Sequence, residues 1–467
     1  MLFAGLIVCI AMLGMFALGV SFLYGVAVAA AIAVAFTVIS ALTLLPAMLG
    51  FFGRRVLRRR ERGAVREGRL RTSDESSAWR RWSGLTERRP GVFAVVAAGL
   101  MVVIAIPFFS MRLGSSDAGS DPANTTTRKA YDLLAKGFGP GYNGPLQLIA
   151  QINTPAQRAG FVRVERAVAG TPGVVGSTQP RLIGGVAGRP EVAIASVYPK
   201  GAPQDASTAD LLHTVRGQVV PASERGTGLH VLTGGQTAIF DDFSTVLSRK
   251  LPLFIGVVVV LSFLLLMAVF RSIVIPLTAA VMNLLSAGAA FGIITAVFQN
   301  GWGASLLGID KTGPIEAFVP VLMFPILFGL SMDYEVFLVS RIYEEWHRRR
   351  DNRAAVTHGL SATGRTITAA AAIMVLVFGA FLLGGERVIE LFGLGLAAAV
   401  LLDAVIVRSV IVPALMLLLG DLNWKLPMVL ERRLPRLNVE GAGSGLPPDP
   451  SAGPGSIDER PVPEPAR

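Results

Sequence analysis

Four residues that could carry or hold a proton interrupt long apolar stretches of this chain. Asp333 and Tyr334 lie in one such stretch, and Asp403 and Arg408 lie in another. A charged side chain at the centre of a membrane helix costs about 2.5–3.5 kcal/mol on insertion scales, so such groups usually face a bundle interior and pair. A carboxyl group held between desolvation and a nearby cation can gain and lose a proton at the working pH. The pattern therefore predicts a buried proton relay made of these four residues.

The spacing within each stretch sets the expected geometry. At about 1.5 Å per residue, Asp333 and Asp403 both lie roughly 23 Å along their helices, which places them at similar depth. Arg408 follows Asp403 by ~140° around an α-helix, so we expect it to reach a neighbouring helix or the cytoplasmic interface and not to stack on Asp403. Glu335 is ~200° from Asp333 and is expected to be an acid that extends to the surface. A simpler alternative is that Asp333 and Arg408 form a purely structural ion pair.

The composition of the chain indicates that apolar helices carry these residues. Of the 467 residues, 52% are hydrophobic and only 16% are charged, against roughly 25% charged residues in soluble domains. A helix of about 20 apolar residues spans the hydrocarbon core of a bilayer. The first apolar run has no basic segment before it and no A-x-A-like cleavage site, so we interpret it as a membrane span and not as a signal peptide. We predict a polytopic α-helical membrane protein with about eight transmembrane helices, at residues 2–20, 22–50, 91–110, 252–270, 273–297, 317–340, 366–384 and 388–419.

The basic residues indicate how these helices are oriented. The net charge is +11, and arginines gather in 54–90 and just after the runs 317–340 and 388–419. Because cytoplasmic loops are enriched in Lys and Arg, we predict that both termini are cytoplasmic and that residues 111–250 are extracytoplasmic. The basic residues are then topology signals, and no nucleic-acid partner is expected.

Sequence signatures of enzymes and metal sites are missing. Cys9 is the only cysteine and the four histidines are scattered, so neither an intrachain disulfide nor a metal site is predicted. The sequence has no G-x-x-x-x-G-K-[ST] loop, no H-E-x-x-H motif and no Ser/His/Asp arrangement. We expect no enzyme activity and no cofactor.

Residues 111–250 are polar, rich in Gly and Pro, and long enough for one small α/β domain. Their patterns follow the order strand–helix–strand–strand–helix–strand of a split βαβ domain. These segments lie at 144–153, 154–170, 173–180, 191–199, 205–220 and 229–235.

An internal repeat suggests how the chain is organised. "LTLLPAMLGFFG" (42–53) aligns with "SVIVPALMLLLG" (409–420), and repeats of this kind are common in transporters. Residues 1–53 then look like the last two helices of a first repeat whose earlier part is absent from this chain. The other expected parts are a mobile basic cytoplasmic loop (54–90), a transmembrane helix (91–110), the extracytoplasmic α/β domain (111–250), a five-helix bundle (251–424) and a disordered cytoplasmic tail (425–467).

Three stretches together resemble the MmpL-type lipid transporters of the resistance–nodulation–division (RND) superfamily. They are "GLSMDYEVFLVSRIYEEW" (329–346), "DAVIVRSVIVPALMLLLG" (403–420) and "LTLLPAMLGFFG" (42–53). These transporters have two halves, each with a porter-like α/β domain, and exchange protons through Asp-Tyr pairs.

By this resemblance, Asp333 and Tyr334 match the pair of the second half, and Asp403 and Arg408 match the acidic and basic residues of the last helix. The resemblance implies export of lipids or other hydrophobic molecules, driven by a proton gradient. The implied partners are the hydrophobic substrate, membrane lipids, and a separately encoded N-terminal half or a second copy of the chain.

Three alternatives remain open at this stage. The chain could be an inactive truncated product or the partner half of a split transporter. It could instead be a sterol- or lipid-sensing membrane protein on the same scaffold, or a relative of the Sec-associated, proton-driven translocation factors.

Overall fold

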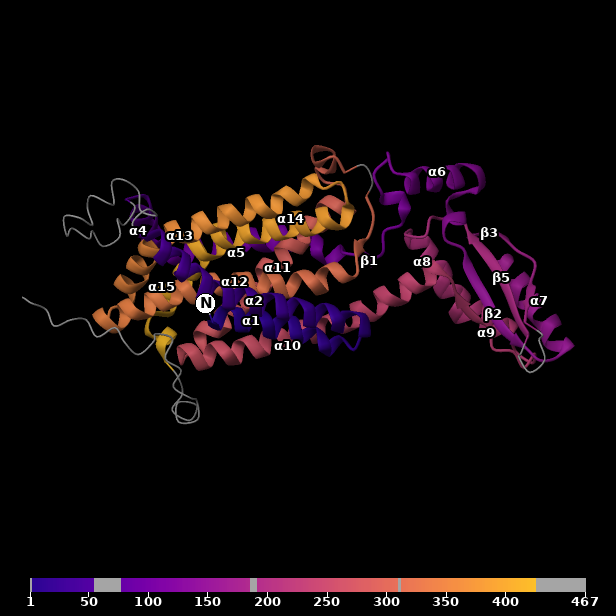
Figure 1. Cartoon of the computed structure of the whole chain (residues 1–467), viewed down its shortest axis with the longest axis horizontal. Helices are drawn as coiled ribbons and strands as arrows, with labels where there is room; N and C mark the ends of the chain where they lie inside the picture. Colours follow the sequence, from indigo (N-terminus) through magenta and orange to yellow (C-terminus); the bar gives the residue numbers. More distant parts are fainter. Residues whose placement is uncertain (1, 54–76, 185–190, 310–311, 426–467) are drawn as a thin grey trace, which may run out of the picture.

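A bundle of apolar helices forms one end of the molecule, and a small α/β unit forms the other (Figure 1). The computed structural model describes residues 2–53, 77–184, 191–309 and 312–425. Apart from Lys425, the predicted tail lies outside these residues, as does the larger part of the predicted loop 54–90.

The described residues contain seven helices that are long and apolar enough to cross a membrane. The last of these spans, Arg387–Trp424, is built from α14, a π-helical segment at Asp403–Ile411, and α15. The helices of the seven spans are α2 (Ser21–Phe52), α5 (Pro90–Ala105), α10 (Gln236–Phe270), α11 (Val274–Ile294), α12 (Phe318–Arg349), α13 (Asn352–Ala380), α14 (Arg387–Leu402) and α15 (Val412–Leu419).

The first of the eight predicted spans differs from its prediction. Residues 2–20 form α1 (Leu2–Leu13) and a 3-10 segment, Gly14–Leu18, which ends at Gly19 with a φ of 64°. Glycine adopts this left-handed conformation without strain and therefore ends helices. The result is an apolar helix shorter than the seven candidate spans, although Ala11 and Met15 are fully buried in the bundle.

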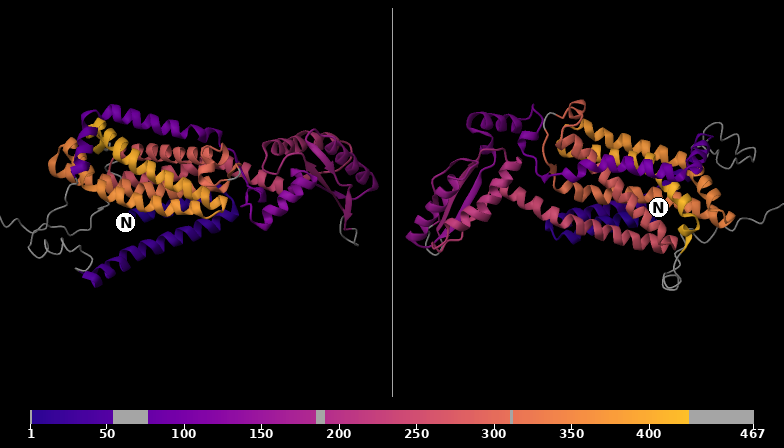
Figure 2. Two further views of the ribbon diagram at one scale, coloured as in Figure 1. Left: turned by 90° about the horizontal axis from the view of Figure 1, so that it is seen from above. Right: turned by 180° about the vertical axis from the view of Figure 1, so that it is seen from behind.

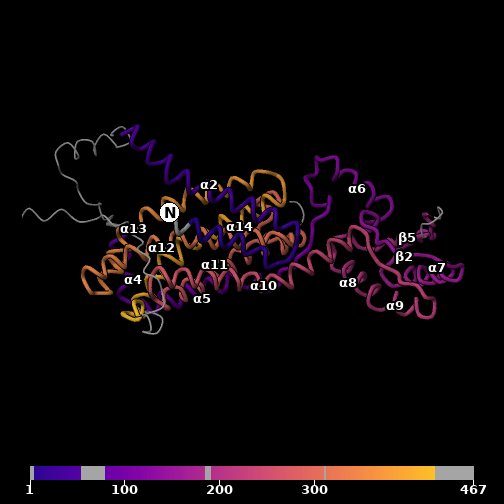
Figure 3. Tube along the Cα trace, turned by 60° about the horizontal axis from the view of Figure 1, so that its bottom comes forward, coloured from indigo at the N-terminus to yellow at the C-terminus, as the bar shows by residue number. Residues whose placement is uncertain are grey.

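In contrast, α2 lies mostly outside the bundle. Figure 3 shows it diverging from the other helices along its length, and the most apolar part of α2 has no buried residue. Phe36 and Leu44 are 68% and 56% exposed. A helix that is apolar on all sides suits contact with lipid.

One continuous helix, α10, joins the two ends of the molecule (Figure 2). It begins at Gln236, well before the predicted run at 252, so the last part of the predicted polar domain belongs to this helix. The ammonium group of Lys250 donates to the carbonyl oxygen of Leu18 at 2.6 Å, which fastens α10 to the end of the first helical segment.

The α/β unit is a five-stranded sheet covered by helices. Its strand order is β3-β5-β2-β6, with β4 paired to β5, and all these neighbours are antiparallel. The order of β3, β5, β2 and β6 agrees with the split βαβ arrangement predicted for this segment, whereas β4 is an additional strand that was not predicted. The elements are β2 (Leu146–Ile152), α7 (Pro155–Ala169), β3 (Val174–Ser177), β4 (Arg181–Ile183), β5 (Glu191–Pro199), α8 (Ala206–Thr214) and β6 (Leu232–Gly234).

Alternation of side chains along the strands builds the core of this unit. Leu146, Leu148, Ala150 and Ile152 of β2 are all buried on one face, as expected for a period of two. They belong to a hydrophobic cluster that includes residues of α7 and α8 such as Phe161.

A second connection between the ends is a short parallel pair of strands, β1 (Leu113–Gly114) and β7 (Ile315–Glu316). The carboxylate of Glu316 accepts a hydrogen bond from the backbone N–H of Ser116 at 2.6 Å and another from its hydroxyl. The segment that leads into the α/β unit is thereby tied to the start of α12.

The described part of the predicted basic loop is ordered, which corrects the expectation of a mobile segment. Ser77–Arg88 form the helix α4. The ring of Trp79 packs directly on Gly364 of α13, and the indole N–H of Trp82 donates to the carbonyl oxygen of Ser409 at 2.9 Å. The contacts of these two tryptophans hold α4 on the bundle.

Close packing of α5 on α11 generates a first prediction. A methyl group at Gly292 would clash with the carbonyl oxygen of Ile104 and lie 3.0 Å from the Cα of Ala105, whereas one at Gly288 would meet Ala105 at 3.9 Å. Gly292→Ala should therefore destabilise the protein by about 1–3 kcal/mol, measured as a lower thermal midpoint in detergent.

The matched control is Gly288→Ala. This substitution adds the same methyl group at an ordinary contact distance and improves helix propensity, so the midpoint should stay level or rise slightly. Equal midpoints for the two variants would show that the close approach at Gly292 does not limit stability.

Candidate functional site

A buried network of polar side chains joins α11, α12 and the last span. Arg408 donates from Nε to Oδ2 of Asp403 at 2.7 Å, and from Nη2 to Oγ of Ser331 at 3.0 Å and to the backbone oxygen of Ser331. The hydroxyl of Ser331 lies within hydrogen-bond distance of Oδ1 of Asp403, at 3.0 Å, and of Oδ1 of Asn283. Asp403 and Arg408 are only 4% and 2% exposed, so their charges must be balanced by one another.

Asp403 and Arg408 meet because the last span is π-helical from Asp403 to Ile411. A π-helix bonds each residue to the one five positions further along, so residues five apart lie nearly in line. The hydroxyl of Ser409 follows the same register and donates to the carbonyl oxygen of Ala404 at 2.6 Å. The prediction that Arg408 does not stack on Asp403 assumed an α-helix and is wrong.

Tyr334 lies at the edge of this network. The guanidinium carbon of Arg408 is 5.4 Å from the centre of the Tyr334 ring, within the range of a cation–π contact. The hydroxyl of Tyr334 lies 2.8 Å from the sulfur of Met374 on α13. Tyr334 and Ser331 are three residues apart on α12 and therefore face the same side of the helix.

Asp333 is not part of the network, which corrects the predicted four-residue cluster. Its side chain is exposed and forms no hydrogen bond or ion pair with a described residue. Asp333, Phe337 and Arg341 are exposed at intervals of four residues and form one stripe along α12. Because Ser331 faces the last span, Asp333 at ~200° from it must face away.

The expectation for Glu335 is also wrong. Glu335 is 4% exposed and lines a small cavity together with Thr278 of α11 and Asn423. It forms no hydrogen bond or ion pair with a described residue. The side of α12 opposite Asp333 is the side that packs in the bundle. Glu335 is therefore enclosed, and Asp333 is not.

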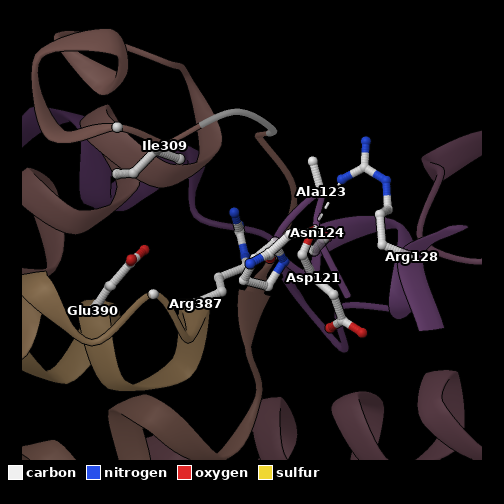
Figure 4. Close-up of a pocket in the computed structure, with 11 residues that line it drawn as sticks. Asp121, Ala123, Asn124, Arg128, Ile309, Arg387 and Glu390 are labelled. Carbon is white, nitrogen blue, oxygen red and sulfur yellow. Dashed lines mark hydrogen bonds between the residues drawn. The ribbon is translucent and has the colours of Figure 1, made fainter. Parts of the chain in front are cut away.

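A second polar site lies where the bundle meets the α/β unit. Figure 4 shows Arg387 and Glu390 of α14 opposite Asp121 and Arg128 across a pocket, whose volume is about 360 Å³. The Nη2 of Arg387 donates to the carbonyl oxygens of Phe298, Gly313 and Pro314 at 3.0–3.2 Å. Arg387 therefore braces the loops at this junction.

Comparison with known proteins decides the family. The sequence model of the MMPL family matches residues 1–93 and 158–439. The chain belongs to the MMPL family. Membership and the seven apolar helices identify it as a multi-pass membrane protein of a transporter family.

Two relatives of known sequence show how much of an MMPL-family protein this chain represents. It is 35% identical over 443 residues to the membrane protein YdfJ of Bacillus subtilis, covering 94% of this chain and 59% of that protein. It is 32% identical over 401 residues to the mycolic acid-containing lipids exporter MmpL11 of Mycolicibacterium smegmatis, covering 85% of this chain and 41% of that protein. The chain thus spans about half the length of these relatives.

The structural comparison supports the fold. A crystal structure of a heavy metal efflux pump matches 89% of this chain and 58% of its own length, with a TM-score of 0.50 and 14% sequence identity.

Reasoning from the sequence missed one member of the network in this MMPL-family protein. Ser331 links Arg408 to Asn283. Serines are common in apolar helices, so the residue type alone did not single out Ser331. The usable signal was its spacing of three residues from Tyr334, which puts both on one face. Asn283 of α11 accepts an interhelical hydrogen bond from Ser331.

The buried pair generates a second prediction. Replacing Arg408 with Gln leaves the carboxylate of Asp403 buried without its cation, so the protein should lose about 3–5 kcal/mol of stability. The measurement is the unfolding midpoint of the purified protein in detergent. Combining Arg408→Met with Asp403→Leu removes both charges and should recover most of the loss.

Arg341→Gln is the control, because Arg341 lies on the exposed stripe of α12 and, among the described residues, pairs only with Glu344. Its free energy of unfolding should change by less than about 0.5 kcal/mol, so its midpoint should stay close to that of the wild type. A wild-type midpoint for Arg408→Gln would contradict a structural role for the pair.

Proposed function

We propose that this protein exports lipids or other hydrophobic molecules across the cytoplasmic membrane and that the proton-motive force drives the export. The observation that carries the proposal is the buried hydrogen bond between Asp403 and Arg408. Ionisable groups inside membrane segments are costly and mark ion and substrate pathways. The name of the M. smegmatis relative, a lipid exporter, supports a hydrophobic cargo.

Asp403 carries the proton in the proposed cycle. While it is ionised, Asp403 accepts hydrogen bonds from Arg408 and Ser331. Taking up a proton converts one acceptor oxygen into a donor and removes the charge that holds Arg408. Protonation thereby changes the bond between Asp403 and Ser331 of α12 and leaves the charge of Arg408 unbalanced. The contacts between the last span and α12 are weakened, so the last span can shift against α12. Release of the proton restores the pair.

Small cavities offer the proton a route. One of about 20 Å³ is lined by Asn283, Ser331, Tyr334 and Asp403, and that volume holds about one water molecule. Within the described part of the chain, Nη1 of Arg408 and Nδ2 of Asn283 have no hydrogen-bond partner, and a water molecule there would satisfy such donors. A second cavity of about 10 Å³ lies beside Glu335, towards the arginine-rich end of α12.

Asp333 completes the proposed relay from the other face of α12. An exposed carboxyl group within a membrane segment is tolerated where it faces a water-filled or protein-lined space. Since Asp333 precedes Tyr334, which lies against Arg408, a shift of α12 after protonation of Asp403 would move Asp333 as well. The α/β unit would act outside the membrane as a porter-like domain, with α10 as its rigid attachment.

Proton flux provides the test of this relay. The full chain is reconstituted in liposomes that contain a pH-sensitive dye, and a pH gradient is imposed. Asp403→Asn cannot carry the proton, so flux should fall at least about tenfold, to the rate of protein-free liposomes. Glu390→Gln, in the same span but outside the network, should keep the wild-type rate. Unchanged flux in Asp403→Asn would remove Asp403 from the relay.

The same liposomes test the remaining parts of the proposal. Asp333→Asn should also lose proton flux, and wild-type flux in this variant would exclude Asp333 while leaving the buried network in place. Movement of a fluorescently labelled phospholipid should require the imposed gradient. Binding of the lipid without any gradient-dependent movement would favour a sensor over an exporter.

A further inference from the structure

A large apolar groove opens beside α4, separate from the polar network. We call it the α4 groove: it has a volume of about 700 Å³ and lies between α4, α13 and the last span, a size typical of ligand sites. Small side chains such as Ala371, Ala372 and Ala404 line it together with larger aliphatic ones, and the contact of Trp79 with Gly364 puts the tryptophan toward the Thr368 end of the lining. An acyl chain suits such an apolar lining.

The tryptophan end of the groove is basic. Arg365 precedes the lining residues Thr368 and Ala372 by three and seven positions on α13, so it lies on the same side of the helix, one turn beyond the lining. Next to it, Trp79 packs on Gly364. Arg80 and Arg81 of α4 follow, and both are exposed, like Arg365. None of the three arginines forms an ion pair with a described residue.

These two properties together describe an amphipathic ligand with a negative head. Trp and Arg gather where the hydrocarbon core meets the headgroups, and exposed arginines attract anionic lipids there. Guanidinium groups also bind phosphate through paired, charge-assisted hydrogen bonds. We propose that the α4 groove binds an anionic phospholipid of the adjacent leaflet, with an acyl chain on Ala372 and Ala404 and the phosphate at Arg365, while Arg80 and Arg81 add attraction for the anionic headgroup from outside the groove.

The groove also touches the π-helical segment. Ala404 and Ser409 line it, and the carbonyl oxygen of Ser409 accepts the hydrogen bond from Trp82. The residues just before them, Asp403 and Arg408, form the buried pair. A lipid in the groove would therefore hold α4 against the turn that carries the pair.

Tryptophan quenching tests the proposal with the full chain in detergent. Phosphatidylglycerol with brominated acyl chains should quench wild-type fluorescence, and the component due to the groove is the part that Trp82→Phe removes. Brominated phosphatidylcholine should need a concentration at least about tenfold higher to quench that component. Arg365→Gln should weaken the phosphatidylglycerol effect about fivefold, and adding Arg80→Gln and Arg81→Gln should abolish the preference for it.

Two matched pairs of variants separate the groove from general lipid contact. Ala372→Phe fills the groove and should remove the quenching component, whereas Ile373→Phe, at the next, exposed position, should keep it. Arg341→Gln should bind like the wild type, in contrast to Arg365→Gln. Thermal midpoints without added lipid show that each variant is folded, since all these side chains are exposed.

Equal quenching by the two lipids, unaffected by Arg365→Gln, would overturn the proposal in favour of non-selective contact with surrounding lipid. Retained quenching in Ala372→Phe would place the lipid elsewhere. Both readouts are independent of proton flux, so a failure here leaves the proposed transport function unaffected.

Discussion

The bond that Arg408 makes with Asp403 and Ser331 is the constraint on which the bundle depends. Each of the two charges would be expensive in an apolar interior without the other, and both groups are bonded to Ser331 of α12, which holds the last span against α12. Asn283 extends the network to α11 through Ser331. Three helices that carry mostly apolar side chains are thereby fixed in one register by a few polar atoms, and the same atoms are the ones that a proton can rearrange.

The π-helical segment gives this constraint an unusual position. Neighbouring residues in the segment have different surroundings: Asp403 and Arg408 belong to the network, while Ala404 and Ser409 line the α4 groove. π-Helical segments are rare in proteins, and those that occur are often found at functional sites. A change of protonation on one side and a bound lipid on the other would act on the same turn. That is a physical basis for coupling, because one element with two arrangements is biased from two sites.

The sequence predicted the general architecture well and the local geometry poorly. Long apolar runs and period-two strands leave strong patterns, so seven of the eight predicted spans correspond to candidate membrane helices, and the strands of the split βαβ pattern were found, although β4 was not predicted. Gly14 and Gly19 weaken the first run, but their effect on helix length depends on the conformation that Gly19 adopts. The residues Asp403 and Arg408 were found by their cost in an apolar run. Their contact could not be predicted, because no residue type in this segment indicates a π-helix. For Asp333 and Glu335 the two faces of α12 were correctly placed on opposite sides, and only tertiary packing decides which one is buried.

The last span connects the network to the junction with the α/β unit, which gives a protonation event a route to the other end of the molecule. It begins at Arg387, whose guanidinium holds the carbonyl oxygens of Phe298, Gly313 and Pro314, and it reaches Asp403 after roughly 24 Å of helix. Pro314 is followed by β7, where Glu316 holds Ser116 at the entrance to the α/β unit. A helix is stiff along its axis, so a shift of the span at Asp403 must be absorbed either within the π-helical segment or at the Arg387 contacts. If the π-helical segment keeps its hydrogen bonds, the displacement in the proposed cycle would pass to the Arg387 contacts and from there, through β7 and Glu316, to the entrance of the α/β unit.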